Sequence, residues 1–96
     1  MGVKLKETGI TEVEKIKKIL EDEGYSVYTW SDSPGTYYPT HTHPDREVRW
    51  VVDGEVVIGV EGKELRLKPG DVVELDPGTP HWAKTDKGVT YICGSK

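Results

Sequence analysis

The stretch GTYYPTHTHPDREVRWVVDG, residues 35–54, contains two of the chain's three histidines, His41 and His43, and a glutamate, Glu47. Successive side chains of a strand alternate between its two faces, so His41 and His43 point the same way if this segment is extended. Glu47 lies four residues beyond His43 and shares their face unless a bulge intervenes. Three polar groups on one inward face are costly unless a partner satisfies them. Imidazoles and a carboxylate suit Fe, Mn, Ni, Cu or Zn, so the stretch predicts a metal site.

The third histidine, His81, opens a different predicted strand within DPGTPHWA, residues 76–83. A barrel could bring that strand beside the first, and His41, His43, Glu47 and His81 would then offer three nitrogens and one oxygen. In an octahedral ion this set leaves about two positions for water, oxygen or substrate. Closed structural zinc sites usually contain thiolates, and the single cysteine, Cys93, gives little support to one.

Arg49 follows Glu47 by two residues and should therefore face inward as well. A buried guanidinium needs an anionic partner. Two interpretations stay open: a salt bridge to Glu47 or another internal carboxylate, or capture of a substrate carboxylate or enediolate by the planar guanidinium. Asp45 has the same strand parity, but it follows Pro44 and is treated as part of a loop.

Four aromatic residues flank the histidines. Trp50 opposes Glu47 in strand parity, so we expect it on the outer face of the barrel or at an oligomer interface. Trp82 opposes His81 in the same way. Tyr37 and Tyr38 precede Pro39 and are expected to rim the mouth of a pocket.

The only helix that the sequence predicts covers residues 11–24, TEVEKIKKILEDEG. Thr11 and Glu14 suggest a capping box, and Gly24 is a natural stop at the C′ position. One helical face gathers the apolar residues Ile10, Val13, Ile16, Ile19 and Leu20. We therefore expect residues 1–24 to be an N-terminal extension whose helix packs on the outside of a sheet.

After Gly24, short β-branched or aromatic runs alternate with turns rich in Gly, Pro and Asp. Short strands at such regular spacing are typical of a sandwich or barrel. A length of 96 residues suits one domain. The predicted fold class is all-β, a small barrel over residues 25–96 with one N-terminal α-helix.

Composition narrows the function classes. The net charge of −4 gives no electrostatic attraction to nucleic acid or to an anionic membrane surface. The sequence has no apolar run near about 18 residues and no signal-peptide core, so we expect a cytoplasmic protein. A short chain with apolar outer faces favours a homodimer. The absence of Asn and Gln beside abundant Lys and Glu is typical of a protein from a hot habitat.

The chain resembles the cupins, which are small β-barrels of the jelly-roll type. Their first motif has a glycine, five residues, H-x-H, three or four residues, Glu, six residues and a glycine, and residues 35–54 match every defined position. Their second motif corresponds to residues 70–85 and contains His81. Asp76 and Thr85 replace the Pro and Asn of the family there, and neither change removes a ligand.

This resemblance implies a jelly-roll barrel with a small-molecule pocket and one divalent transition metal, held by His41, His43, Glu47 and His81. The stretch EVRWVVDGE, residues 47–55, is similar to part of the acireductone dioxygenases, in which an Arg also follows the ligand Glu by two. A metal-dependent dioxygenase, with Arg49 as a candidate substrate contact, is the enzyme class that this favours. A non-catalytic binding or sensing module and a cupin isomerase or epimerase stay open as alternatives.

Overall fold

Nine strands and one helix make up the part of the chain that the computed structural model describes, residues 2–96. Their bounds are β1 (Val3–Glu7), α1 (Val13–Asp22), β2 (Ser26–Asp32), β3 (Tyr37–His41), β4 (Glu47–Gly54), β5 (Val56–Val60), β6 (Lys63–Leu67), β7 (Asp71–Leu75), β8 (His81–Lys84) and β9 (Val89–Ser95).

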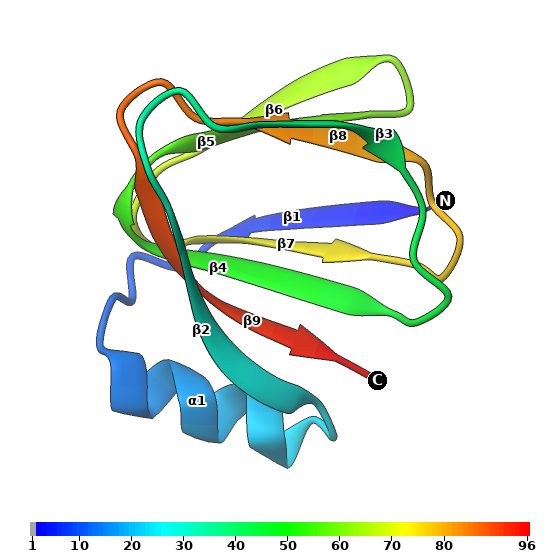
Figure 1. Cartoon of the computed structure of the whole chain (residues 1–96). Coiled ribbons are helices and arrows are strands. Elements are labelled where there is room, and N and C mark those ends of the chain that lie inside the picture. The colour runs from blue at the N-terminus through cyan, green and yellow to red at the C-terminus, as the bar shows by residue number, and fades with distance from the viewer. Residues whose placement is uncertain (1) are drawn as a thin grey trace.

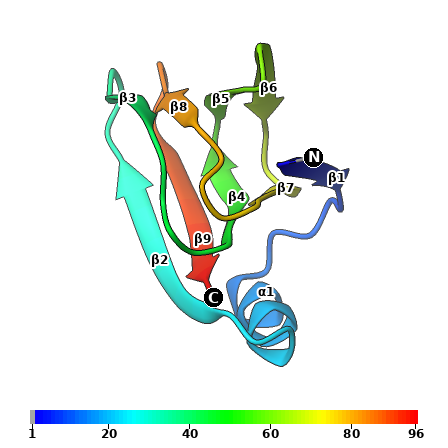
Figure 2. The same cartoon turned by 90° about the vertical axis from the view of Figure 1, so that its right-hand side faces the viewer.

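The strands form two antiparallel sheets that face each other (Figure 1). One sheet has the order β1-β7-β4-β9-β2, and the other has the order β3-β8-β5-β6. Because neighbours in each sheet come from distant parts of the chain, the strands cross between the sheets and enclose a small jelly-roll barrel. The all-β prediction with one helix is confirmed. Figure 2 shows that β2 and β3, the last strands of their sheets, lie on the same side of the barrel.

Strand β4 divides its side chains between two apolar clusters. Val51 points into the barrel and packs with Ile58, Leu67 and Val73. Val48 and Trp50 point outward and pack against the helix. Trp50 is only 5% exposed, so α1 rather than a subunit interface covers it. The alternation predicted for this strand is therefore present, and it leaves Glu47 and Arg49 on the inner side.

The start of helix α1 differs from the sequence prediction, and its end agrees with it. It starts at Val13, the N-cap is Glu12, and no side chain caps it, so the predicted capping box of Thr11 and Glu14 is wrong. At the other end, Gly24 has φ +92° and closes the helix as predicted. The apolar face is also confirmed, because Ile16 and Leu20 are buried against the sheet with Ile10, Val13 and Ile19 around them.

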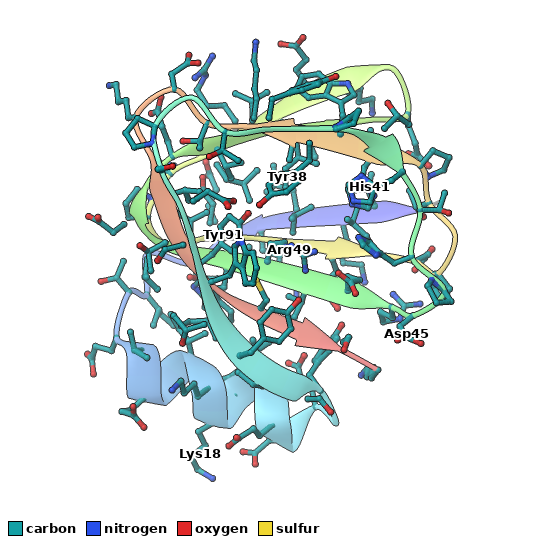
Figure 3. The ribbon with its side chains drawn as sticks, viewed as in Figure 1. Lys18, Tyr38, His41, Asp45, Arg49 and Tyr91 are labelled. Atoms are coloured by element: carbon teal, nitrogen blue, oxygen red, sulfur yellow. The ribbon has the colours of Figure 1, made fainter. Side chains whose placement is uncertain are left out.

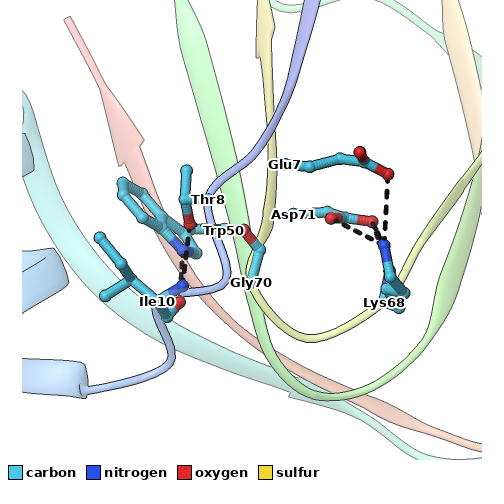
Figure 4. Close-up of polar contacts among 7 residues, drawn as sticks. All are labelled: Glu7, Thr8, Ile10, Trp50, Lys68, Gly70 and Asp71. Carbon is cyan, nitrogen blue, oxygen red and sulfur yellow. Dashed lines mark hydrogen bonds and ion pairs between the residues drawn. The ribbon is translucent and has the colours of Figure 1, made fainter.

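The segment before the helix belongs to the sheet. Strand β1 pairs with β7 along its whole length, a strand that the sequence analysis did not predict. The residues that follow it bind two parts of the sheet: the Thr8 hydroxyl donates to the Gly70 carbonyl in the turn before β7 at 2.6 Å, and Trp50 Nε1 of β4 donates to the Ile10 carbonyl at 2.9 Å (Figure 4). Lys68 bridges Glu7 and Asp71 in the same region.

Across residues 2–96, α1 is too short and too polar to span a lipid bilayer.

Candidate metal centre and cavity

The three histidines come together at one end of the four-stranded sheet. His41 ends β3 and pairs in register with His81, the first residue of β8. His43 lies two residues beyond His41, and their Nε2 atoms are 3.1 Å apart. One ring nitrogen of each histidine lies within 4.8 Å of the others. His41 and His81, which are 40 positions apart in sequence, thus meet because strands β3 and β8 pair with each other.

Hydrogen bonds fix two of these rings in the form that binds metals. The Nδ1 atom of His41 lies 2.7 Å from the Pro39 carbonyl, and that of His81 lies 2.9 Å from the Thr79 carbonyl. A carbonyl only accepts, so each Nδ1 carries the proton and each Nε2 presents a lone pair, which in His41 faces the Nε2 atom of His43. Such outer hydrogen bonds orient imidazoles that ligate metals. Burial lowers the pKa of His81, which keeps this ring neutral.

Glu47 lies beside the histidines but on the other sheet. Its side chain is 10% exposed, and Oε1 is 4.0 Å from His43 Nε2. The same oxygen forms an ion pair with Arg49, whose Nη2 lies 2.6 Å away. Within residues 2–96, Oε1 has no hydrogen-bond partner. A buried carboxylate oxygen that has an ion pair but no hydrogen bond, 4.0 Å from His43 Nε2, fits a place beside a bound cation.

The structure thus brings three of the four predicted ligands into one cluster and leaves Glu47 at its edge, paired with Arg49. Both interpretations of Arg49 retain support, since the guanidinium contacts Glu47 and also lines a cavity. Asp45 is exposed in the loop and lies outside the histidine cluster, as expected (Figure 3).

A cavity of about 270 Å³ runs from the histidines into the barrel. Figure 3 shows Tyr38, His41, Arg49 and Tyr91 projecting into the space between the two sheets. Beyond the histidines, Arg49 and Cys93, the lining is aromatic or aliphatic and includes Tyr28, Trp30, Ile58 and Leu75. The volume suits a small molecule with one polar, chelating end.

A polar cluster that no sequence pattern predicts lies at the aromatic side of this cavity. Asp32, the last residue of β2, accepts hydrogen bonds from Tyr38 OH at 2.6 Å, Tyr91 OH at 3.0 Å and Trp30 Nε1 at 3.0 Å. In the sequence, Asp32 is one residue of the turn SDSPG, and nothing local distinguishes it from an ordinary turn aspartate. Only the pairing of β2 with β9 brings Tyr91 to it.

The two neighbouring tyrosines have separate roles. Tyr38 lines the cavity, as predicted for both. Tyr37 is 59% exposed and packs on the outside against Trp82, with ring centroids 6.4 Å apart, so its predicted place at the pocket is wrong. Trp82 lies on the outer face as expected, pressed so closely on Gly59 that a Cβ there would overlap the indole.

Cys93 lines the cavity as a buried thiol. Burial raises its pKa to about 12, so it stays protonated near neutral pH. This agrees with a site built from imidazoles and a carboxylate rather than from thiolates.

Two relatives are similar in sequence to parts of this chain. The acireductone dioxygenase of Tuber melanosporum is 34% identical over 68 residues, which cover 66% of this chain and 39% of that protein. The dimethylsulfoniopropionate lyase DddQ of Ruegeria pomeroyi is 42% identical over 52 residues, covering 53% of this chain and 26% of the lyase. This chain therefore corresponds to only a part of these relatives.

Solved structures agree on the fold. The DddQ crystal structure matches with a TM-score of 0.70 at 32% identity, over 75% of this chain and 38% of that one. A DUF861 family protein from Thermotoga maritima matches with a TM-score of 0.68 over 98% of this chain and 99% of its own, at 19% identity, which shows a shared fold alone. The profile of the cupin domain matches residues 28–93. That match covers more than half of the sequence and confirms the resemblance read from the two motifs, so this chain belongs to the cupin family.

Proposed function

We propose that this chain is a metal-dependent cupin that acts on a small molecule held in its barrel cavity. One observation carries the proposal: one ring nitrogen each of His41, His43 and His81 lies within 4.8 Å of the others, and the buried Oε1 of Glu47 lies 4.0 Å from His43 Nε2. The three histidines line the 270 Å³ cavity, together with Arg49. A site of this kind binds a ligand next to whatever ion the side chains hold.

The ion would be held by His41, His43 and His81, with Glu47 as the fourth ligand once its carboxylate turns from Arg49. Three nitrogens and one oxygen are compatible with Fe, Mn, Ni, Zn or Cu. A bound ion of this group supplies a Lewis acid and, if it is redox active, a means of using molecular oxygen. The side chains of the barrel would orient the ligand and exclude water.

Dioxygenation is the reaction class that we favour. Several relatives are named acireductone dioxygenase, among them proteins of Bacillus pumilus and Vitis vinifera. Arg49 would bind a carboxylate or enediolate of the substrate, because its planar guanidinium faces the cavity and can share its donors between Glu47 and a ligand. The aliphatic and aromatic lining would keep water away from the reacting atoms.

The binding-module alternative also has an observation in its favour. The hydroxyl protons of Tyr38 and Tyr91 both bind Asp32, so neither phenol is free to act as a base at the cavity. An isomerase or epimerase working by proton transfer, or a lyase like the named relative from Ruegeria, would need another base. Oxygen uptake during turnover supports the dioxygenase. Product formed without oxygen uptake supports the isomerase, epimerase or lyase. Ligand binding that survives removal of the metal supports the binding module.

Three other expectations stay predictions: a homodimer, a cytoplasmic location and a hot habitat. Among residues 2–96, the exposed large apolar side chains are those of Leu5, Tyr28, Trp30 and Tyr37, on which a second copy could pack. Mass measurement by light scattering would test the dimer directly.

The first experiment is a metal analysis. Tag-free protein purified without chelators should carry about one transition metal ion per chain, and His43→Ala should lose most of it because a ligand is gone. Asp45→Ala is the matched control, since Asp45 is exposed in the same loop and lies outside the cluster. Equal metal content in the wild type and His43→Ala would sink the proposed site.

A further inference from the structure

We propose that the aromatic end of the cavity is a binding subsite for a small methylated organic cation. The subsite consists of Tyr28, Trp30, Tyr38 and Tyr91, with Asp32 behind them, and we call it the aromatic cage. This inference goes beyond the proposed function and needs neither a metal nor turnover.

Four aromatic side chains from three strands line this part of the cavity, and three of them, Trp30, Tyr38 and Tyr91, bind Asp32. Tyr28 and Trp30 come from β2, Tyr38 from β3 and Tyr91 from β9. The faces of aromatic rings carry negative electrostatic potential, and several rings around one space attract a cation whose methyl groups need no hydrogen bonds. A neutral apolar ligand would gain the contact area but not this attraction.

Asp32 gives the aromatic cage a negative charge. Its Oδ1 accepts from Tyr38 and Trp30, and its Oδ2 accepts from Tyr91. Because both phenol protons are directed at the carboxylate, the phenol oxygens present only lone pairs to a ligand. Within residues 2–96, no Lys, Arg or His nitrogen lies within 4.0 Å of the Asp32 carboxylate. The charge of Asp32 is therefore left without an ionic partner, and a ligand cation can supply one.

Among residues 2–96, Arg49 is the one arginine that lines the cavity, and an ion pair offsets its charge. The charge of Arg49 is balanced by Glu47, whose Oε1 lies 2.6 Å from Nη2. The cavity thus has an uncompensated carboxylate behind the aromatic cage and paired or neutral groups elsewhere. A ligand that carries an onium group in the cage and an acceptor group toward Arg49 would match both parts.

The aromatic cage can also be reached from solvent. Tyr28 is 42% exposed and Trp30 is 48% exposed, although both line the cavity. β2 is the last strand of its sheet, so no further strand covers this side. By contrast, the outer aromatic pair of Tyr37 and Trp82 already has a cation above it, because Lys84 Nζ lies 5.9 Å from the Trp82 ring. That pair offers no site for a second cation.

Calorimetric titration with choline tests the inference on the full chain, with metal content measured in the same sample. Choline should bind saturably, and about tenfold more tightly than its neutral isostere in which carbon replaces the quaternary nitrogen. Asp32→Asn should remove most of this preference, because it keeps an oxygen acceptor but loses the charge. The titration needs no oxygen, so a failed dioxygenase assay leaves its result intact.

Two more variants keep the test decisive if Asp32→Asn does not fold. Trp30→Leu, at an exposed position, should weaken choline binding about tenfold and leave the isostere nearly unaffected. Tyr37→Leu removes an aromatic ring outside the cavity and should leave choline binding unchanged. The inference is overturned if the folded wild type shows no saturable choline binding, if it binds choline and the isostere equally, or if folded Trp30→Leu keeps the full preference.

Discussion

At the scale of single residues, the site depends on which nitrogen and oxygen atoms already have hydrogen-bond partners. Backbone carbonyls bind the Nδ1 atoms of His41 and His81, which leaves the Nε2 lone pairs for another partner. Glu47 shares the same surroundings but has only the charge of Arg49 beside it. A carboxylate in this position can serve an arginine or a metal ion, and its two roles compete for one oxygen.

Replacing Glu47 by Gln separates these roles. The substitution removes the charge opposite Arg49, whose side chain is only 16% exposed, so we expect the unfolding free energy to fall by about 2 kcal/mol. The metal content should fall as well. Urea denaturation and metal analysis of the same variant measure both effects.

The surface pair of Arg46 and Asp76 is the matched control for Glu47→Gln. Its atoms are also 2.6 Å apart, but the side chains are 38% and 44% exposed. Asp76→Asn should therefore cost no more than about 1 kcal/mol. Equal losses in the two variants would mean that burial of the inner pair contributes nothing.

At the scale of elements, the alternation of side chains along β4 and the end of α1 decide how the helix and the cavity are placed. β4 sends Glu47, Arg49 and Val51 inward, and it sends Val48 and Trp50 toward α1. One strand therefore supplies both the polar wall of the cavity and the apolar floor under the helix. A one-residue shift of β4 would exchange the two sets, which ties the position of the site to the packing of the helix.

The end of α1 gives a prediction at this scale. Gly24 N–H donates to the Glu21 carbonyl at 3.0 Å, and Tyr25 N–H donates to the Leu20 carbonyl at 3.1 Å, with Gly24 in the left-handed region at φ +92°. Gly24→Ala should lower the unfolding free energy by about 1–2 kcal/mol, measured by urea denaturation.

The cost of Gly24→Ala is conformational, because a Cβ at this position meets only Lys96 Cδ at 3.9 Å. Gly24→Asn is therefore the comparison, since Asn tolerates the left-handed region better than Ala. A smaller loss for Asn than for Ala supports this explanation. Identical losses would point to packing instead.

At the scale of the whole molecule, the site exists only when the two sheets face each other. The histidines belong to the four-stranded sheet side, while Glu47 and Arg49 belong to the five-stranded sheet. An ion that binds both sheets would join the halves of a small barrel, and binding to the folded state alone stabilises it by mass action.

Removal of the ion should therefore lower the melting temperature. At a free metal concentration near 100 times Kd, binding contributes about 2.7 kcal/mol. For a chain of this size, that corresponds to a decrease of about 10–20 °C on chelation. Calorimetric scans with and without chelator measure it, and His43→Ala should show no chelator effect. A melting temperature that stays the same after the ion is shown to be gone would mean that metal binding and folding are not coupled.

The sequence by itself determined the features that depend on local period and composition. The two-residue period of a strand placed Glu47 and Arg49 inside and Trp50 outside, and the helical period gave the buried face of α1. The spacing of the two motifs pointed to the cupin family, which the domain match confirmed.

Only the tertiary structure decided the features that need distant strands to pair. The register of β3 with β8 puts His81 beside His41, the pairing of β2 with β9 brings Tyr91 to Asp32, and β1 finds its partner in β7. Hydrogen bonding between strands far apart in sequence leaves no local pattern, so the aromatic cage could not be derived from the residues alone. The salt bridge of Arg49 to Glu47 was one of two interpretations that the sequence left open, because both residues lie on one strand.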